Sequence, residues 1–463
     1  MADTVDTRSA AVAAMAESWP IVTALLGGTS AMRKAGKAYL PQWPNEADDS
    51  YRVRLSQATL YPAFSRTVEV LASKPFSKAM TLSDNTPERI KKWCDDVDLQ
   101  GRNLQAFASE IMRDCVGYGI SGVLVDYPKA EGVQTVADEK AVGVRPYFVH
   151  YPPGTVLGWR TQRTNGAERL VQLRLKETIS EQSGEFGNVE TQQIRVLAPG
   201  SWQVYRQSEK KDWMLFDEGV TTLSEIPFVA FYGNRTGFMM GTPPLMELTY
   251  LNVEHWQSSS DQQTILHVAR VPILTVIGAD SETQITVGAA AAVKLPIGAS
   301  MSFVEHSGQA IGAGREALID LEERMRQTGS ELLVLTPGNA TATQVATENE
   351  ASKCALQKIA ENVEDALDQC LMFMAQWVGE AEGGNVELFK DFGSASLTDA
   401  SAQLLLTAAT AGKISDATLI SEYKRRGILA AEIDFDDEQE RLADQGPPMG
   451  KIGQQGQANA ISQ

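Results

Sequence analysis

The run from Leu245 to Arg270 contains no helix-breaking residue, and it limits the folds open to this chain more than any other feature. Pro243 and Pro244 precede it, where a helix tolerates residues that lack an N–H group. At about 1.5 Å per residue, the run predicts a helix of roughly 40 Å, which is long for one globular domain. The apolar segments on either side, Ile226 to Tyr232 and Val271 to Ile277, have the pattern of short buried strands.

The surface of this predicted helix changes along its length. Apolar residues occur at its start (Leu245, Leu248, Leu251) and at its end (Ile265, Leu266, Val268, Ala269). The stretch between them is polar, and its candidate functional residues are Gln257, Ser258, Ser260, Asp261 and Gln262. Such a helix does not suit burial in one continuous core, so its middle should meet water or a polar neighbour. A helix that crosses a wet gap between two subdomains has the same pattern, and the sequence leaves both interpretations open.

Length and charge narrow the class of protein. A chain of 463 residues exceeds one hydrophobic core and predicts roughly two to four subdomains. The formal charge of −18 argues against tight wrapping of nucleic acid but permits a surface that DNA passes without sticking. The four cysteines and four histidines show no metal-type spacing, so we expect no metal site, no cofactor and a reducing compartment. No secretory signal and no apolar run of membrane length is visible.

The first 143 residues are mostly helical in pattern. Gly27 to Thr29 should break the first helix, and Pro62 should kink a later one. Asn103 is a candidate N-cap for a helix that Gly117 and Gly119 stop. A buried strand, Ile120 to Tyr127, follows at once.

From Val144 to Tyr232 the apolar period changes from helical to two, which predicts an antiparallel meander of about five to seven strands. Beyond the long helix, the region 271–395 has several expected elements. They are a small β-unit from Ser281 to Glu305, a helix from about Arg315 to Thr328, a short strand from Leu332 to Leu335, the polar loop Thr336 to Thr343, and a very regular helix.

That regular helix has apolar residues at heptad spacing, namely Leu356, Ile359, Val363, Ala366, Cys370, Phe373 and Trp377. The spacing predicts packing along a partner helix with a nearly parallel axis, in the same chain or in another one. Two more helices, at 396–411 and 415–426, should end at glycines, and Ser415 is a candidate N-cap for the second. Residues 442–463 are rich in Gln, Gly and Pro and are expected to be disordered.

No catalytic constellation emerges from the sequence. Gly312-Ala313-Gly314 with Ala317 matches GxGxxA, but a dinucleotide-binding loop follows a buried strand, and the residues from Glu305 to Gln309 are polar. An ordinary helix start explains the glycines better than a cryptic nucleotide site does. We therefore expect no enzymatic activity.

Five stretches, taken in their order along the chain, resemble a portal protein of tailed bacteriophages, in the branch known only as a domain of unknown function. They are YLPQWPNEADDSYRVRL (Tyr39 to Leu55), GYGISGVLVDY (Gly117 to Tyr127), the segment from Ile226 to Leu251, FVEHSGQAIGAGREALIDLEERMRQTG (Phe303 to Gly329) and LLLTAATAGKISDATLISEYKRRGIL (Leu404 to Leu429). Their order, more than any single motif, carries the resemblance.

The resemblance implies an α+β portal fold with a helical and β wing, a stem of long helices, a β-containing clip and a C-terminal helical crown. By position it assigns 1–143 to the helical wing, 144–242 to the β-rich wing and clip, 243–270 to the stem helix, 271–395 to the wing with the tunnel loop and the heptad helix, and 396–441 to the crown. The candidate tunnel-loop residues are Thr336, Asn339, Thr341 and Thr343.

Portal proteins form a ring, usually dodecameric, at one capsid vertex, and double-stranded DNA is packaged and ejected through it. The resemblance implies a homo-oligomeric ring in the virion, assembled in the host cytoplasm, that passes DNA without sequence specificity. It implies the terminase large subunit and the major capsid, scaffolding and neck or adaptor proteins as partners, and no membrane. The alternative is a virion or scaffold protein without a channel that uses its long helices for partner binding.

Overall fold

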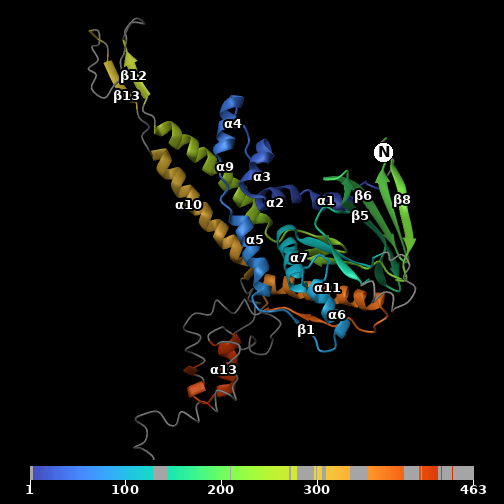
Figure 1. Cartoon of the computed structure of the whole chain (residues 1–463). Coiled ribbons are helices and arrows are strands. Elements are labelled where there is room, and N and C mark those ends of the chain that lie inside the picture. The colour runs from blue at the N-terminus through green and yellow to red at the C-terminus, as the bar shows by residue number, and fades with distance from the viewer. Residues whose placement is uncertain are drawn as a thin grey trace, which may run out of the picture. The chain divides into compact units, whose positions relative to one another are not determined.

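The computed structural model describes residues 4–128, 144–208, 210–270, 273–278, 297–298, 300–304, 309–333, 353–390, 406–407, 409–425, 429 and 441 (Figure 1). The chain divides into two compact units, Met1–Val334 with Cys354–Phe389 and Leu335–Lys353 with Lys390–Gln463. The second unit contains α13 (Asp416–Arg425). Ser415 caps α13 by accepting a hydrogen bond from the Thr418 N–H at 3.2 Å, as the sequence predicts.

The N-terminal part of the first unit is helical. Its helices are α1 (Ala10–Ala16), α2 (Trp19–Leu26), α3 (Gly28–Ala35), α4 (Asp48–Gln57), α5 (Ala63–Ser73), α6 (Glu88–Trp93) and α7 (Leu104–Tyr118). Asn103 caps α7 by accepting a hydrogen bond from the Ala106 N–H at 2.8 Å. Gly119 ends α7 in the left-handed region, with φ of 84°. The predicted N-cap and the stop at Gly119 are confirmed, whereas Gly117, also expected to stop the helix, lies inside α7.

The predicted break at the glycines is confirmed, because α2 ends at Leu26 and Gly28, with φ of 71°, turns the chain into a new helix, α3. One expectation for this part is wrong. Pro62 does not kink one helix. Ala58 leaves the helical region, with ψ of 134°, so α4 and α5 are separate helices on either side of an extended connection.

A three-stranded antiparallel sheet has the order β3 (Tyr147–Tyr151), β2 (Ile120–Asp126), β9 (Phe228–Tyr232). The helices α7 and α11 (Ala355–Trp377) contact this sheet and each other. The heptad positions of α11 from Leu356 to Cys370 are buried, and Trp377 Nε1 donates a hydrogen bond to the Val125 carbonyl oxygen at 2.9 Å. The partner of the heptad stripe thus lies in the same chain, but it is chiefly a sheet and not a parallel helix. An apolar helical stripe can pack on any apolar surface of matching shape.

A second sheet is the predicted antiparallel meander. Its strands are β4 (Val156–Thr164), β5 (Ala167–Ser183), β6 (Gly187–Ala198), β7 (Ser201–Gln207) and β8 (Trp213–Val220), in that spatial order. β3 and β9, which the sequence places in the same meander, pair instead with β2. A buried apolar cluster that includes Leu124, Leu173, Leu175, Leu197 and Phe228 joins the two sheets.

An ion-pair network also joins the sheets. The Arg195 guanidinium on β6 lies 2.7 Å from Asp126 Oδ2 on β2 and 2.8 Å from Glu177 Oε1 on β5. Desolvation lowers the pKa of Arg195, but the two carboxylates and Tyr151 outweigh it and raise that pKa above its usual value. Arg195 is therefore charged, and its burial depends on both carboxylates.

A pair of antiparallel helices, α9 (Met246–Ala269) and α10 (Gln309–Ser330), follows the sheets in the chain (Figure 1). β12 (Ile273–Ile277) and β13 (Ser300–Val304) pair with each other at the far end of these helices. α9 matches the predicted long helix, whereas α10 begins earlier than predicted. The expected strand at Leu332 is wrong for the described residues, which form a 3-10 turn, Glu331–Leu333. The short strands are β1 (Thr81–Leu82), paired with β14 (Val386–Glu387), and β10 (Arg235–Gly237), paired with β11 (Met240–Gly241).

The end of α7 packs tightly against the chain that leads into α9, which makes Gly119 a stability test. A Cβ at Gly119 would lie 2.1 Å from the backbone carbonyl of Thr242, and φ is positive there. We expect Gly119→Ala to lower the free energy of unfolding by on the order of 4 kcal/mol or more in urea denaturation. Gly166→Ala is the control, because Gly166 has a similar φ but no atom near its Cβ position, and it should cost about 1–2 kcal/mol. Equal losses would contradict the close packing.

Candidate functional site

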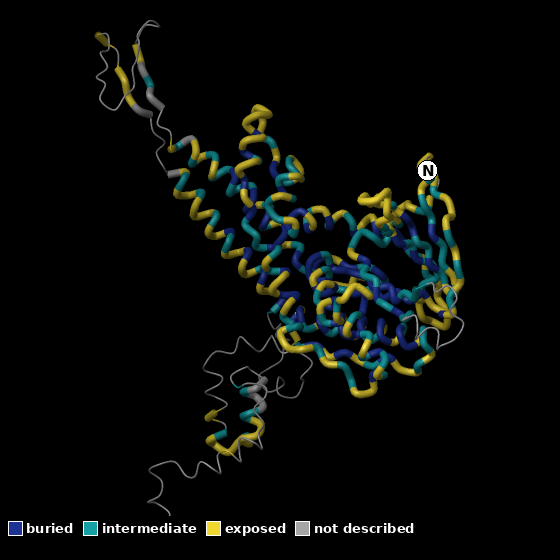
Figure 2. Tube along the Cα trace, viewed as in Figure 1, coloured by how far each residue is buried: buried dark blue, intermediate teal, exposed yellow. Residues whose placement is uncertain are grey.

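The helix pair with its terminal strands is the candidate functional site, and the N-terminal two-thirds of α9 anchor it. Leu248, Thr249, Asn252 and Trp256 have no exposed surface (Figure 2). Exposure then increases along the helix, and Ile265 is 36% exposed. Leu245 and Leu248 of the predicted apolar stripe are therefore buried in the first unit and Leu251 is half-buried, while Ile265 near the other end is exposed.

Asn252 joins α9 to the break between α4 and α5. Its Nδ2 donates a hydrogen bond to the Tyr61 carbonyl oxygen at 2.9 Å, and its Oδ1 accepts one from the Phe64 N–H at 2.9 Å. The Phe64 N–H belongs to the first turn of α5, where no intrahelical acceptor is available. A polar side chain on α9 therefore holds the N-terminus of α5.

Two glutamines of the predicted polar stretch bind backbone carbonyls of other segments. Gln257 Nε2 donates to the Tyr39 oxygen at 3.0 Å, and Gln262 Nε2 donates to the Ile311 oxygen of α10 at 3.0 Å. The polar middle of α9 therefore meets polar neighbours of the same chain, which is one of the two interpretations that the sequence leaves open.

The neighbour of Asp261 is an ion pair that holds the loop before α4. Arg54 and Glu46 are buried side chains joined by two hydrogen bonds of 2.8 Å, from Nε and Nη2 of Arg54 to the two carboxylate oxygens. Arg54 Nη2 also donates to the Pro41 carbonyl oxygen at 2.8 Å, and the Trp43 ring lies 4.1 Å from the guanidinium carbon. The hydrogen bond from Arg54 holds the pKa of Glu46 below its usual value. No sequence pattern identified Arg54 or Glu46 as a buried, paired residue.

Asp261 is half-buried close to this pair. Desolvation raises the pKa of Asp261 above its ordinary value, and the attraction of Arg54 offsets this only in part. Ser260, the next residue toward the N-terminus, is 2% exposed, and its hydroxyl has no hydrogen-bond partner in the described part of the chain. Neither side chain is freely solvated in a single copy of the protein.

The GxGxxA match lies inside α10. Gly312 and Gly314 fall within the helix, and a Cβ at Gly314 would lie 2.2 Å from Gln262 Oε1. The missing side chain lets α10 approach α9 closely, and a phosphate would find no loop there. Further down the pair, the buried His255 has its Nε2 at 3.5 Å from Glu322 Oε1 of α10.

The far end of the helix pair exposes apolar side chains. The described residues between α9 and α10 include three exposed apolar side chains, those of Ile277, Ile297 and Met301. A two-stranded ladder such as β12 and β13 is marginally stable by itself in water. This end therefore has the character of a contact surface.

The structure brings the channel candidates together on one helix but does not place them all on one open surface. Gln257 and Gln262 contact other segments, Ser258 and Asp261 are half-buried, and Ser260 is buried. Their role as a channel lining stays a prediction. Thr336, Asn339, Thr341 and Thr343 of the tunnel-loop prediction lie outside the described residues.

A Ser–His–Asp cluster that the sequence does not reveal lies between α7, β2 and β3. His150 Nε2 is 2.9 Å from both Ser121 Oγ and Asp114 Oδ2. In a catalytic triad the serine and the acid bind opposite ring nitrogens, whereas here Ser121 and Asp114 bind the same one. The other nitrogen, Nδ1, lies 3.7 Å from Glu110 Oε1, which is beyond hydrogen-bond distance. Ser121 is also buried. The cluster therefore satisfies buried polar groups and does not form a nucleophile.

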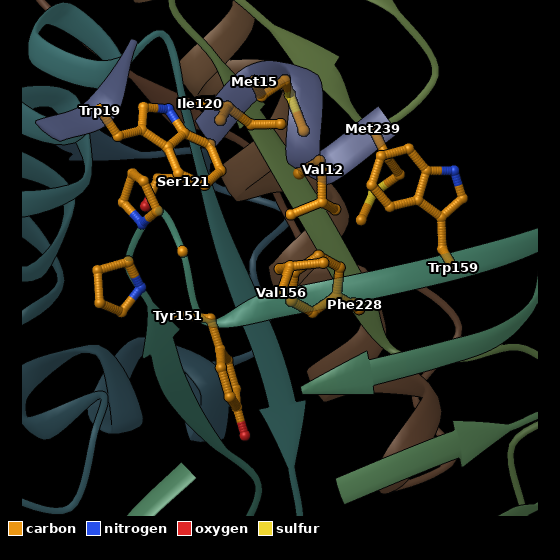
Figure 3. Close-up of a pocket in the computed structure, with 14 residues that line it drawn as sticks. Val12, Met15, Trp19, Ile120, Ser121, Tyr151, Val156, Trp159, Phe228 and Met239 are labelled. Carbon is orange, nitrogen blue, oxygen red and sulfur yellow. The ribbon is translucent and has the colours of Figure 1, made fainter. Parts of the chain in front are cut away.

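A small apolar cavity of about 20 Å³ lies where α1 and α2 meet the sheets (Figure 3). Val12, Trp19, Ile120, Tyr151 and Phe228 are among the residues that line it. This volume has room for about one water molecule and is too small for a cofactor. Among the described residues, no group of His, Cys, Asp and Glu side chains is arranged to hold a metal ion. The same residues include no helix that is both long and apolar enough to span a membrane.

Comparison with protein families matches residues 244–378 to a family described as a domain of unknown function (DUF4055). The match includes the helix pair, its hairpin and α11. No curated protein matches the sequence.

Several solved structures share a distant likeness with the chain. A chain in the virion of a native gene transfer agent (GTA) particle is 12% identical, with a TM-score of 0.41, over 85% of this chain and 97% of that one. A chain in the neck of the empty GTA particle, with C6 symmetry, is 12% identical, with a TM-score of 0.40, over 79% and 90%. A chain in the neck of the native particle, with C12 symmetry, is also 12% identical. Its TM-score is 0.40, and the match covers 80% of this chain and 89% of that one. TM-scores of this size do not establish a common fold.

The buried Arg54–Glu46 pair should be a large contributor to stability. Glu46→Ala leaves the Arg54 charge buried without its carboxylate, so we expect a loss of about 3–5 kcal/mol in the free energy of unfolding. Asp49→Ala is the matched control, because the pair of Asp49 with Arg52 is 86% and 74% exposed, and this variant should be nearly as stable as the original. Similar losses in both variants, measured by urea denaturation, would show that the buried pair does not organise the loop.

Asp261→Asn should stabilise the protein at neutral pH. Because desolvation raises the pKa of Asp261 in the folded state, the charged carboxylate opposes folding above that raised pKa, and the cost disappears as pH falls toward the ordinary value of 3.8. The stability difference between Asp261→Asn and the original protein should therefore be largest near pH 7 and shrink on acidification. Urea denaturation of both proteins between about pH 4 and 8 measures it. A difference that grows as pH falls would contradict the assignment.

Proposed function

We propose that the chain is a virion structural protein that assembles into a ring at a capsid vertex and forms the channel for double-stranded DNA during packaging and ejection. The observation that carries the proposal is the antiparallel pair α9–α10, anchored at one end by buried contacts and ending in a hairpin with exposed apolar residues. The resemblance of the ordered sequence stretches to portal proteins supports it. In this proposal the chain performs no catalysis, and a terminase motor drives the DNA.

A ring needs an element that is firmly held by its own subunit and still reaches beyond it. The bonds from Asn252 and Gln257 fix the near part of α9, and the bond from Gln262 fixes α10 against it. With about 36 Å of helix in α9, copies arranged around an axis would line a channel with a set of helix pairs. This arrangement corresponds to the stem that the sequence resemblance assigns to 243–270.

The charges on the helix pair suit a passage for DNA. The pair exposes carboxylates on both helices (Glu247, Glu254, Glu316, Asp320, Glu323) and arginines on α10 (Arg315, Arg324, Arg326). Mixed charge provides no continuous cationic track that would release counterions and hold the phosphates. DNA could therefore slide past such a surface, in agreement with the net charge of −18.

The hairpin β12–β13 is the better candidate for the clip that contacts the motor or neck proteins. The sequence resemblance placed the clip within 144–242, where the meander packs on the three-stranded sheet. The hairpin, by contrast, lies between α9 and α10 in the chain, at the far end of the helix pair, and exposes Ile277 and Met301. An apolar surface at the end of a stem suits a ring of neighbouring hairpins and a docking partner.

The proposal predicts closed rings of the purified full-length protein. Negative-stain images and native mass spectrometry at micromolar concentration should show one large species with a central hole wide enough for a DNA duplex. Rings with a narrower hole would favour the non-channel scaffold function. Monomers alone, at several salt concentrations, would exclude both the ring and the channel.

A further inference from the structure

Strand β5 extends beyond its neighbours at both ends and takes part in two opposite arms. At its start, Ala167 to Gln172 pair only with β4, and at its end, Thr178 to Ser183 pair only with Gly187 to Gln192 of β6. We call the first the β4–β5 arm (Arg160 to Gln172) and the second the β5–β6 arm (Thr178 to Gln192). The outer part of each arm is a two-stranded ribbon of exposed residues, while the base of the β4–β5 arm packs on the core through Leu170. Two-stranded ribbons are only marginally stable alone, so the outer part of each arm gains from a partner.

The β5–β6 arm is acidic and solvated. It carries Glu181, Glu185 and Glu190 and no lysine or arginine. All residues from Ser180 to Glu190 are exposed, and Phe186 at the tip is 91% exposed. Glu181 at the base is bound by Arg206 of β7 at 2.8 Å, which leaves Glu185 and Glu190 as the outer charges.

The β4–β5 arm has the opposite charge. It carries Arg160, Arg163 and Arg169 against one carboxylate, Glu168. Arg169 pairs with Glu225 of a neighbouring loop, and Arg163 Nε donates a hydrogen bond to the Gly166 oxygen. Arg160 and Arg163 are exposed, and the ion pairs of the described residues include neither of them. They are the charges of this arm that are available to a partner, with Arg163 near the tip and Arg160 at the base.

The two arms cannot meet within one molecule. They lie at opposite ends of one strand, which spans about 55 Å at roughly 3.3 Å per residue. Complementary charges at opposite ends of a rigid element match only between copies. We infer that the acidic β5–β6 arm of one copy docks on the basic β4–β5 arm of the next, a head-to-tail contact that repeats around a ring.

The partner that best fits both arms is a second copy of this chain. DNA phosphates would be repelled by Glu185 and Glu190, and a separate partner for each arm would require two different proteins. A head-to-tail contact uses two different surfaces on each subunit, and such contacts close into rings when the rotation permits it. The inference rests on the proposed ring and names one of its subunit contacts.

Charge reversal with rescue tests the contact. The full-length protein and the variants E185R/E190R, R160E/R163E and the combination of all four substitutions are compared by sedimentation velocity at about 50 mM and 500 mM salt, where screening differs strongly. We expect each double variant to need about tenfold more protein for half-assembly at low salt, and the combined variant to assemble within about threefold of the original. High salt should also raise the protein concentration that the original protein needs for half-assembly, because it screens the same charges.

Controls separate the contact from folding and from net charge. E69R/K92E reverses exposed charges on α5 and α6 and should leave assembly unchanged. E185Q/E190Q, which only removes the acidic charges, should weaken assembly less than E185R/E190R does, and thermal unfolding verifies that each variant folds. If the original protein forms rings and both reversals form them equally well, or the combined variant is not rescued, the arm contact is wrong while the ring stands. If the original protein does not assemble, both proposals fail.

Discussion

Polar side chains on α9 connect the parts of the first unit. Asn252, which is buried, binds backbone groups at the break before α5. Two half-buried glutamines bind other segments: Gln257 holds the loop that begins at Tyr39, and Gln262 holds α10. A buried polar group that loses its partner costs more than the bond itself contributes, so the contact of Asn252 fixes the start of α5 in one position. An apolar helix could be buried equally well but would not select the loop, α5 and α10 so specifically.

The stretch from Tyr39 to Leu55, one of the five that carry the resemblance to portal proteins, takes part in the same contacts. In the structure this stretch is a loop and α4, organised by the buried pair of Arg54 with Glu46 beside Asp261. The family match from 244 to 378 begins just before α9 and ends just after α11. Both segments therefore take part in one arrangement, a helix pair held at its base by a polar loop and by the helices α2, α4 and α5. The proposed channel depends on that base being rigid.

Prediction from the sequence succeeded where the signal is local and strong. The caps of α7 and α13, the meander β4–β8 and the length of α9 follow from capping residues, period-two alternation and the absence of helix breakers. It failed at Leu332 and at Pro62, where the local pattern suits more than one conformation. The partner of α11 was also misidentified, because the spacing from Leu356 to Cys370 describes one apolar stripe and not the surface that covers it.

The sequence by itself determined most of the elements, the polar character of the middle of α9 and the acidic charge of the chain. These depend on periodicity, caps and composition, which are local properties. Only the tertiary structure decided that Gln257 and Gln262 bind other segments, that Arg54 is buried with Glu46, and that His150 contacts both Asp114 and Ser121. Each of these contacts joins residues whose separation in the chain has no helical or strand period, so their proximity arises only when the sheets and helices pack.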